Sequence, residues 1–284
     1  MNCQQNVIQK DLFSRFNPFC IWNEKELPGP PNVQDKNSTD IIKSLDSYSN
    51  YSLNDLSNAK LMNRIDTKFL LPLTLLPRLL ADLCSDYSVL EIGDERLFTY
   101  ENTYFDTPDM QFYNMHHNGK QNRFKMRYRR YVETDTAYIE IKFKSNKKRM
   151  IKKRIKVKDN NLLFSDINGF ATRELQRNFN SLYPRLSGRF RRISLADEKS
   201  GERITIDSFL SFKDFPGKES VNLPKHMIAE LKQYRRNISS PFFNLMRHYN
   251  MRPVKFSKYC IGTVLLNNGN IKSNRFKQIL IKIN

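Results

Sequence analysis

Apolar and polar positions alternate with a two-residue period over much of the chain from residue 61 onward. A strand with one buried face has this period, because successive side chains point to opposite faces. A first segment, NRIDTKFLL, begins at Asn63. Six more segments show the alternation: 99–107, 122–132, 137–144, 150–157, 202–212 and 227–234. The pattern therefore predicts a protein built mainly of antiparallel strands.

Helical spacing is confined to three stretches. Residues 73–86 form one candidate, with Thr74 and Pro77 near its first turn. Residues 166–182 form a second, and residues 241–251 form a third that Ser240 can cap and Pro241 can start. Together with the strands, these helices predict an α+β fold, mainly antiparallel β, with flanking helices.

The periodic pattern also suggests where the domain lies. Residues 1–58 show little periodicity and carry the turn-forming run PGPPN at 28–32, so we expect an irregular or partly helical N-terminal extension. Residues 59–268 hold all of the strands and form the expected domain. Residues 269–284 are predicted to be a basic C-terminal tail.

The charge balance narrows the class of partner. The chain has 48 Lys and Arg against 29 Asp and Glu, which gives a formal net charge of +19 and favours binding to polyanions such as nucleic acid, acidic membranes or phosphate chains. The four cysteines form no CxxC pair, so neither a zinc site nor a disulfide framework is indicated. No apolar stretch is free enough of charge and proline to span a bilayer. We expect a soluble cytoplasmic protein, with peripheral association at the inner membrane as an option.

Each predicted strand has one charged face. These faces hold Arg64, Asp66, Lys68; Arg123, Lys125, Arg127, Arg129; Glu140, Lys142, Lys144; Lys152, Arg154, Lys156; Arg203, Thr205, Asp207; and Glu230, Lys232. For any single strand, a solvent-exposed face is the simplest interpretation. Several neighbouring basic strands would repel one another, however. A sheet closed into a barrel with its charged face inward would let a bound polyphosphate relieve that repulsion.

Four acidic residues interrupt the basic faces, namely Asp66, Glu140, Asp207 and Glu230. A nucleic-acid groove does not need carboxylates beside its phosphate contacts, because they oppose the charge term that drives binding. Mg²⁺ or Mn²⁺ does need them, since these ions take one or two protein oxygens and complete their shell with phosphate and water. The four acids are therefore candidate metal ligands, with salt bridges between strands as the alternative for each one. No Gly-rich phosphate loop, G-x-S-x-G or HExxH motif occurs.

The same residues resemble the VTC (vacuolar transporter chaperone) domain, the polyphosphate polymerase family of the triphosphate tunnel metalloenzymes, in its bacterial stand-alone form. The resemblance runs from about Asn63 to Leu266. It rests on motifs in a shared order: RIDTKF at 64–69, TYFDT at 103–107, KMRYRRY at 125–131, IEIK at 139–142, KKR at 152–154, RITID at 203–207, AELK at 229–232 and VKFSKY at 254–259.

The resemblance implies a closed triphosphate-tunnel β-barrel of about eight strands. It also implies an ATP-dependent polyphosphate polymerase that transfers the γ-phosphate of ATP onto a growing polyphosphate chain and releases ADP. The catalytic residues carried over are Lys68, Arg127, Arg129, Lys142, Arg192 and Arg203. Further phosphate contacts are expected from Arg64, Lys125, Lys152, Arg154, Lys232, Lys255 and Lys258. Glu230 would bind Mn²⁺ or Mg²⁺, with Asp66, Glu140 and Asp207 as further candidate ligands.

Two positions depart from the family pattern: Asp66 stands where Glu is common, and Phe190 stands where Tyr is common. Two other functions remain open. A metal-dependent tripolyphosphate or nucleoside triphosphate hydrolase would use the same clamps with water as the acceptor. A non-enzymatic polyanion-binding protein would show salt dependence without metal dependence. The interleaved acids argue against nucleic acid as the partner.

Overall fold

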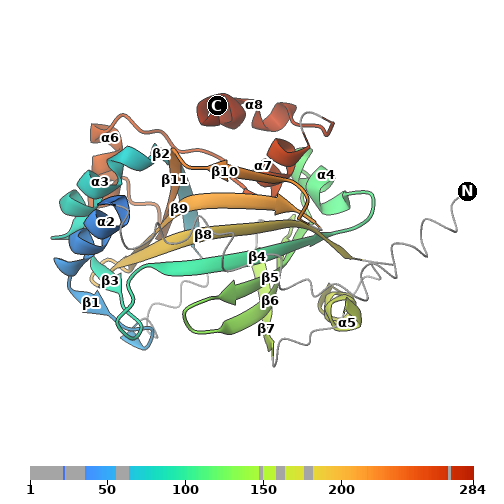
Figure 1. Cartoon of the computed structure of the whole chain (residues 1–284), viewed down its shortest axis with the longest axis horizontal. Helices are drawn as coiled ribbons and strands as arrows, with labels where there is room; N and C mark the ends of the chain where they lie inside the picture. Colours follow the sequence, from blue (N-terminus) through green and yellow to red (C-terminus); the bar gives the residue numbers. More distant parts are fainter. Residues whose placement is uncertain are drawn as a thin grey trace, which may run out of the picture.

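The fold is built on one large sheet, whose strands lie one below another at the centre of Figure 1. The computed structural model describes Trp22 and residues 36–55, 64–146, 150–157, 164–175, 182–215, 217–267 and 270–284. Eleven strands form the sheet. They are β1 (Asn50–Tyr51), β2 (Ile65–Pro72), β3 (Ser88–Leu90), β4 (Phe98–Asp106), β5 (Arg123–Tyr131), β6 (Thr136–Lys144), β7 (Met150–Val157), β8 (Tyr183–Asp197), β9 (Glu202–Asp214), β10 (Ser220–Leu223) and β11 (His226–Gln233).

Short helices flank this sheet. They are α2 (Lys36–Asp46), α3 (Leu76–Leu83), α4 (Gln111–His117), α5 (Phe164–Leu175), α6 (Pro241–His248), α7 (Lys258–Leu266) and α8 (Lys277–Ile283), with 3-10 turns at Leu73–Leu75 and Asn274–Phe276. The α+β class, the seven predicted strands and the three predicted helices are confirmed within the described residues. Of the helices that the structure describes, none combines the length and apolar composition that a bilayer span requires.

Eight strands run in the order β2-β11-β9-β8-β4-β5-β6-β7. The expected closure of the barrel is wrong, because the described residues of β2 and β7 do not pair. Part of the reason lies at β2, whose edge accepts another segment: the Val254 amide donates to the Lys68 carbonyl oxygen at 2.7 Å. The sheet is therefore barrel-like but open along one side.

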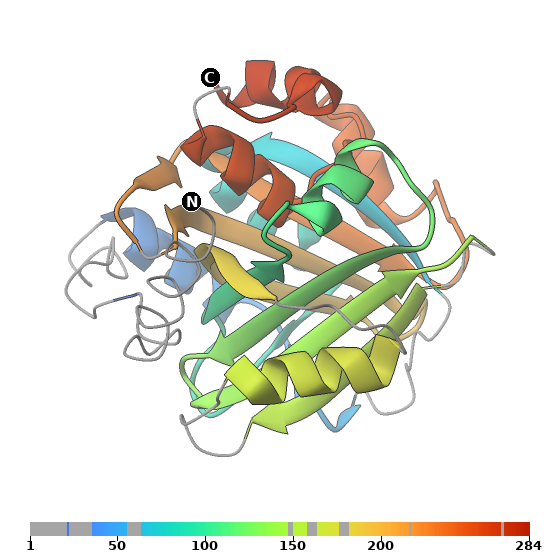
Figure 2. The ribbon, with the colours of Figure 1, turned by 90° about the vertical axis from the view of Figure 1, so that its right-hand side faces the viewer.

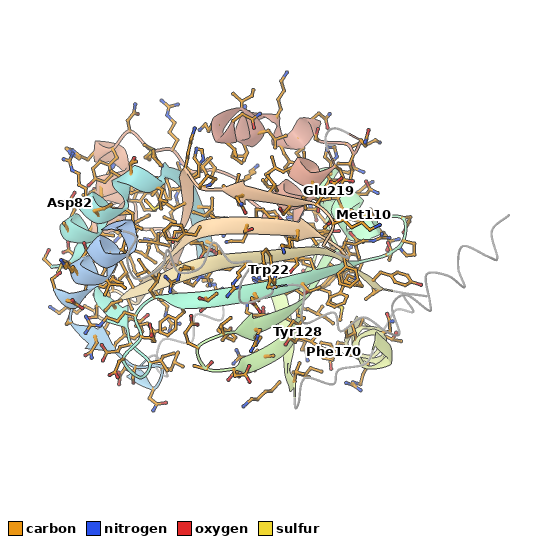
Figure 3. All side chains as sticks on the ribbon, in the orientation of Figure 1. Trp22, Asp82, Met110, Tyr128, Phe170 and Glu219 are labelled. Carbon is orange, nitrogen blue, oxygen red and sulfur yellow. The ribbon has the colours of Figure 1, made fainter. Side chains whose placement is uncertain are left out.

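Three apolar clusters hold the helices against the sheet. In the first, α2, α3 and α6 pack against the outer face of β2, β8, β9 and β11. In the second, α7 and α8 pack against the inner face at one end of the sheet. In the third, α5 lies along β5 and β6, as Figure 2 shows, and its Phe170 belongs to the same cluster as Tyr128, labelled in Figure 3.

A β-bulge decides which residues of β8 and β9 face inward. Between the pairs Arg189–Ser211 and Arg191–Ser208, β9 has one more residue than β8, and Phe209 takes a φ of 51° there. The extra residue reverses the alternation along β9. One half of the strand thus turns Asp207 inward, and the other half turns its apolar residues toward α7.

The end of the sheet beneath α7 needs a close approach of helix to strand. A Cβ on Gly262 would lie 2.7 Å from the Phe212 ring and 2.9 Å from Leu186. Glycine at this position lets α7 sit directly on β8 and β9. The N-terminus of α7, capped by the Ser257 hydroxyl, is thereby held at the inner face of the sheet.

The residues predicted as a basic tail contain the 3-10 turn Asn274–Phe276 and α8, which pack on the domain through Phe276 and Ile279 respectively. The N-terminal extension lies largely outside the described residues. Its one described residue before α2 is Trp22, whose indole N–H donates to the Ser187 hydroxyl at 2.6 Å (Figure 3).

Candidate functional site

A groove of about 300 Å³ lies on the inner face of the sheet. Among the described residues, twelve basic and three acidic side chains line it. They come from β2 and the residue before it, from β5, β6, β7, β8 and β11, and from the start of α7. The basic residues are Arg64, Lys68, Arg123, Lys125, Arg127, Arg129, Lys142, Lys144, Lys152, Arg192, Lys232 and Lys258, and the acidic ones are Asp66, Glu140 and Glu230.

Glu230 of β11 stands at one end of the groove. It lies directly opposite Lys68 of β2, and its Oε1 is 2.6 Å from the Lys68 ammonium. The Lys232 ammonium lies 3.8 Å from the other carboxylate oxygen and donates to the Thr205 hydroxyl at 2.6 Å. Burial opposes ionisation of Glu230, yet Lys232 and Lys68 hold its pKa well below the usual value. Glu230 is therefore a carboxylate at neutral pH.

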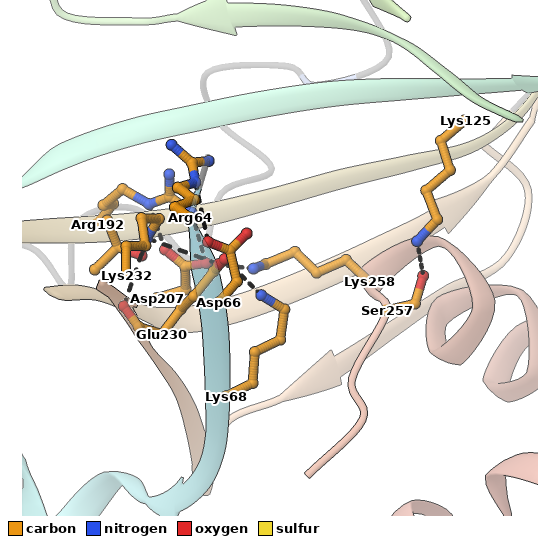
Figure 4. A network of polar contacts seen from close by, with 11 residues as sticks. Arg64, Asp66, Lys68, Lys125, Arg192, Asp207, Glu230, Lys232, Ser257 and Lys258 are labelled. Atoms are coloured by element: carbon orange, nitrogen blue, oxygen red, sulfur yellow. Dashed lines mark hydrogen bonds and ion pairs between the residues drawn. The ribbon is translucent and has the colours of Figure 1, made fainter. Parts of the chain in front are cut away.

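Asp66 shares this end of the groove and is close enough to interact with Glu230 (Figure 4). Burial and the Glu230 charge raise the pKa of Asp66, whereas Arg64, 2.9 Å away, lowers it. Two carboxylates that interact in this way favour a cation between them.

Asp207 lies behind the wall of the groove, where its carboxylate is held by two cations. It faces Arg192 across the β8–β9 ladder, with contacts of 2.5 and 2.8 Å, and it also accepts a hydrogen bond from Lys258 (Figure 4). Burial disfavours the charged form of Asp207, but the two cations hold its pKa well below the usual range. Burial also lowers the pKa of Lys258, to about 8.

Glu140 on β6, like Asp207, is a carboxylate held by two cations. Its side chain is buried, and Arg127 contacts it at 2.7 and 2.5 Å from the neighbouring strand β5. Lys152 of β7 contacts the other carboxylate oxygen at 2.5 Å. Burial disfavours the charged form, yet Arg127 and its neighbours hold the pKa of Glu140 far below its ordinary value. Glu140 thus ties three strands together and fixes two groove cations in place.

Two further lysines are half-buried in the groove. The Lys125 ammonium donates to the Ser257 hydroxyl at 3.1 Å, and burial lowers its pKa to about 8. Burial, with the nearby Arg127 charge, lowers the pKa of Lys142 well below its usual value. Both lysines gain from a bound anion, because an anion would restore the stability of their charged forms.

An aromatic pair separates three of the cations. Tyr100 and Phe190 stack with ring centroids 5.4 Å apart. The Arg192 and Arg129 guanidinium groups lie 4.6 and 5.0 Å from the Tyr100 ring centroid, and the Lys258 ammonium lies 4.3 Å from that of Phe190. Cation–π contacts of this kind stabilise positive charges that would otherwise repel one another.

The structure brings most of the predicted site residues into this one groove. Three predicted basic residues do not line it. Arg203 has the inner-face register of β9 but lies beyond the groove, where Tyr51 and Arg64 influence its charge. Arg154 stacks over the Tyr138 ring at 4.9 Å, and Lys255 is exposed before α7.

Several groove residues were not predicted as site residues. Alternation placed Arg123 and Lys144 on the charged faces that hold Lys125 and Lys142, but the family resemblance did not include them among the site residues. Ser257 and Tyr259 lie in the VKFSKY motif. Tyr259 stacks on Tyr104 at 5.4 Å, and no spacing rule in the sequence joins these two residues.

The donor set fits a divalent cation that is shared with a phosphate ligand. Within the described part of the chain, no three His, Cys, Asp or Glu side chains gather as a complete cation site. Glu230 and Asp66 supply carboxylate oxygens at one end of a groove that is otherwise basic. Mg²⁺ and Mn²⁺ are commonly held by one or two carboxylates together with substrate phosphates. The groove is thus suited to an anion of several phosphates and a metal ion.

A basic inner groove on a barrel-like antiparallel sheet is the arrangement that the resemblance to the VTC domain implies. The VTC domain matches residues 63–267, which is most of the chain, and the chain belongs to this family. A comparison with curated proteins gives no significant match.

Solved structures of related architecture are distant in sequence. A candidate adenylate cyclase from Bacillus halodurans is 14% identical, with a TM-score of 0.45 over 69% of this chain and 96% of its own. A candidate adenylyl cyclase from Hippeastrum, described as having a dominant triphosphatase activity, is 12% identical, with a TM-score of 0.44 over 74% of this chain and 96% of its own. A candidate adenylate cyclase from Vibrio parahaemolyticus is 9% identical, with a TM-score of 0.41 over 68% of this chain and 94% of its own.

Proposed function

We propose that this protein is a metal-dependent polyphosphate polymerase that transfers the γ-phosphate of ATP onto a growing polyphosphate chain and releases ADP. The observation that carries the proposal is the charge of the groove. Twelve basic and three acidic side chains line it. Even when the buried Asp207 is counted with the acidic residues, basic side chains remain in excess, and their positive charge is more than one nucleoside triphosphate would neutralise. A second polyanion in the same groove would use the remainder.

The basic residues are distributed in a way that suits two phosphate ligands. In Figure 4, Lys125 and Ser257 lie well away from the cluster of Asp66, Glu230 and Lys68. We assign the nucleotide to the Glu230 end, where Lys68, Arg192 and Lys232 would hold phosphate oxygens. We assign the acceptor chain to the stretch lined by Arg123, Lys125 and Lys144.

In this reaction the protein has to align the reacting phosphates and neutralise their charge. Phosphoryl transfer needs the attacking and leaving oxygens in line and the equatorial oxygens stabilised. Arg127 and Arg192 are fixed for this task by Glu140 and Asp207, so they need little reorganisation when phosphate binds. Glu230 and Asp66 would hold Mg²⁺ or Mn²⁺, which supplies further neutralisation of phosphate charge when bound.

A hydrolase on the same groove is the second candidate, and the partial exposure of groove side chains favours it. Lys68 and Lys152 are 26% and 40% exposed, so water can reach phosphates bound beside them. Water in place of the acceptor phosphate would yield free phosphate and no polymer.

One assay separates the two reactions. The purified protein is incubated with ATP and Mn²⁺, with and without a short polyphosphate primer, and ADP, free phosphate and polymer length are measured. A ladder of long polyphosphate with matching ADP supports the polymerase. Free phosphate without polymer assigns the hydrolase, and no turnover in either condition would contradict both enzymatic proposals.

A further inference from the structure

An exposed aromatic side chain stands at the rim of the groove, just beyond β11. Tyr234 follows Gln233, the last residue of β11, and is 62% exposed. The ladder with β2 ends at the pair Gln233–Ile65, and Tyr234 is in the bend that follows. One further step in the same register and alternation would put Tyr234 on the side of Glu230 and Lys232, opposite Arg64, all three of which line the groove. On this extrapolation the Tyr234 ring lies just outside the groove, at its Glu230 end.

The loop that carries Tyr234 is fixed at its base by contacts that do not involve the Tyr234 side chain. The buried Gln233 amide donates to Glu202 Oε1 at 2.6 Å and to the Asn237 carbonyl oxygen at 2.9 Å. The Ile238 carbonyl oxygen accepts from the Arg247 guanidinium at 2.9 Å. The Tyr234 ring is thus presented from an ordered loop, which limits the entropy lost when a ligand stacks on it.

A guanidinium group accompanies this ring. The Arg235 guanidinium carbon lies 5.9 Å from the Tyr234 ring centroid. An aromatic ring beside an arginine is a stacking platform for a planar π system, and base–aromatic stacking tolerates any base. Tyr234 is four residues from Glu230, about 13 Å along an extended strand, a separation that a ribose and a phosphate chain can bridge.

We infer that Tyr234, together with Arg235, is the subsite for the base of a nucleoside triphosphate whose phosphates occupy the Glu230 end of the groove. The inference rests on the proposed function and makes it more specific. Stacking of the base on Tyr234 would give a nucleoside triphosphate a higher affinity for the groove than inorganic triphosphate has. The ligand class is a nucleoside triphosphate, with stacking as the source of preference and little discrimination among purines.

The test compares two ligands that differ in the base. Binding of a non-hydrolysable ATP analogue and of inorganic tripolyphosphate, each with Mg²⁺, is measured by calorimetry on the full chain. The variants are Tyr234→Ala, Tyr234→Phe and, as a matched control, Ile281→Ala, which truncates another exposed apolar side chain on α8. Tyr234→Ala is expected to weaken the ATP analogue about 5- to 150-fold and to leave tripolyphosphate unchanged. Tyr234→Phe, which keeps the ring, and Ile281→Ala should both match the wild type.

The outcomes separate this inference from the proposed function. Unchanged affinity of Tyr234→Ala for the ATP analogue overturns the base subsite while the groove assignment stands. Equal weakening of both ligands also overturns it, because the ring would then act on the phosphates or on the fold. Wild-type protein that binds neither ligand overturns the proposed function, and the subsite with it.

Discussion

Arg192 and Asp207 face each other across the β8–β9 ladder and form a two-point ion pair beside the groove, with contacts of 2.5 and 2.8 Å. The pair occurs where it does because the bulge at Phe209 resets the register between the two strands. Lys258 adds a second cation to the same carboxylate. Asp207 is therefore placed to organise two groove cations, and its oxygens are already engaged by them.

Asp207→Asn should destabilise the protein. The substitution leaves Arg192 and Lys258 buried without their countercharge, and breaking a buried ion pair from one side costs about 3–5 kcal/mol. Urea denaturation measures the change in the free energy of unfolding. Asp94→Asn, at an exposed loop position, is the control and should stay within about 0.5 kcal/mol of the wild type. A loss of metal affinity at full stability would instead make Asp207 a metal ligand.

Glu230→Gln should abolish metal-dependent turnover while the fold is kept. The amide keeps the volume of the side chain but removes the charge that we assign to Mg²⁺ or Mn²⁺ binding, and a loss of about 100-fold or more is expected. Turnover is measured across a Mn²⁺ titration, with Glu198→Gln in an exposed turn as the control. Wild-type rates in Glu230→Gln would remove this residue from the metal site.

Triphosphate binding near pH 8 should take up protons. Burial lowers the pKa of Lys125, Lys232 and Lys258 to about 8, so a fraction of each is neutral in the empty groove at that pH. A bound anion stabilises the ammonium forms and raises these pKa values. Calorimetry in buffers of different ionisation enthalpy measures the uptake, and affinity should fall as the pH rises from about 7 to 9. Proton release, or affinity that is flat over this range, would contradict the prediction.

His116 should make stability depend on pH just below neutrality. Burial, with the positive charges of Lys125, Arg123, Arg275 and Lys144, lowers its pKa from 6.5 to about 2. Below about pH 6.5 the unfolded chain binds a proton that the folded protein does not. Stability is thus fully present above that pH and is lost as the pH falls, by at most about 1.4 kcal/mol per pH unit.

Urea denaturation between pH 5.0 and 6.5 checks this expectation. His116→Asn should reduce the slope of stability against pH in that window, where the buried carboxylates Asp207 and Glu140 remain ionised in the folded protein. His248→Asn, at an exposed position on α6, is the control and should keep the wild-type slope. An unchanged slope in His116→Asn would show that another group is responsible.

Local pattern was enough to predict seven of the eleven strands and the charged faces of most of these seven. The alternation in KMRYRRY and IEIK places Arg127, Glu140 and Lys142 on one side of β5 and β6, and the register then brings Arg127 opposite Glu140. The same alternation placed Lys68 and Glu230 on charged faces, and the family resemblance added Arg192; all three line the groove. β8 was missed because the adjacent basic residues Arg191 and Arg192 break the apolar–polar alternation along it. α7 was missed because it is apolar on nearly all sides and shows no periodicity.

The sequence by itself determined which residues share a face, because alternation along a strand depends only on local backbone geometry. Tertiary structure decided what each face meets. The bulge at Phe209 turns Asp207 toward Arg192, and Arg203, on the same strand, falls beyond the groove. Val254 occupies the edge of β2 at Lys68, so the described sheet stays open where a closed barrel was expected. Register, bulges and edge pairing depend on cross-strand partners distant in the sequence, and no local pattern encodes them.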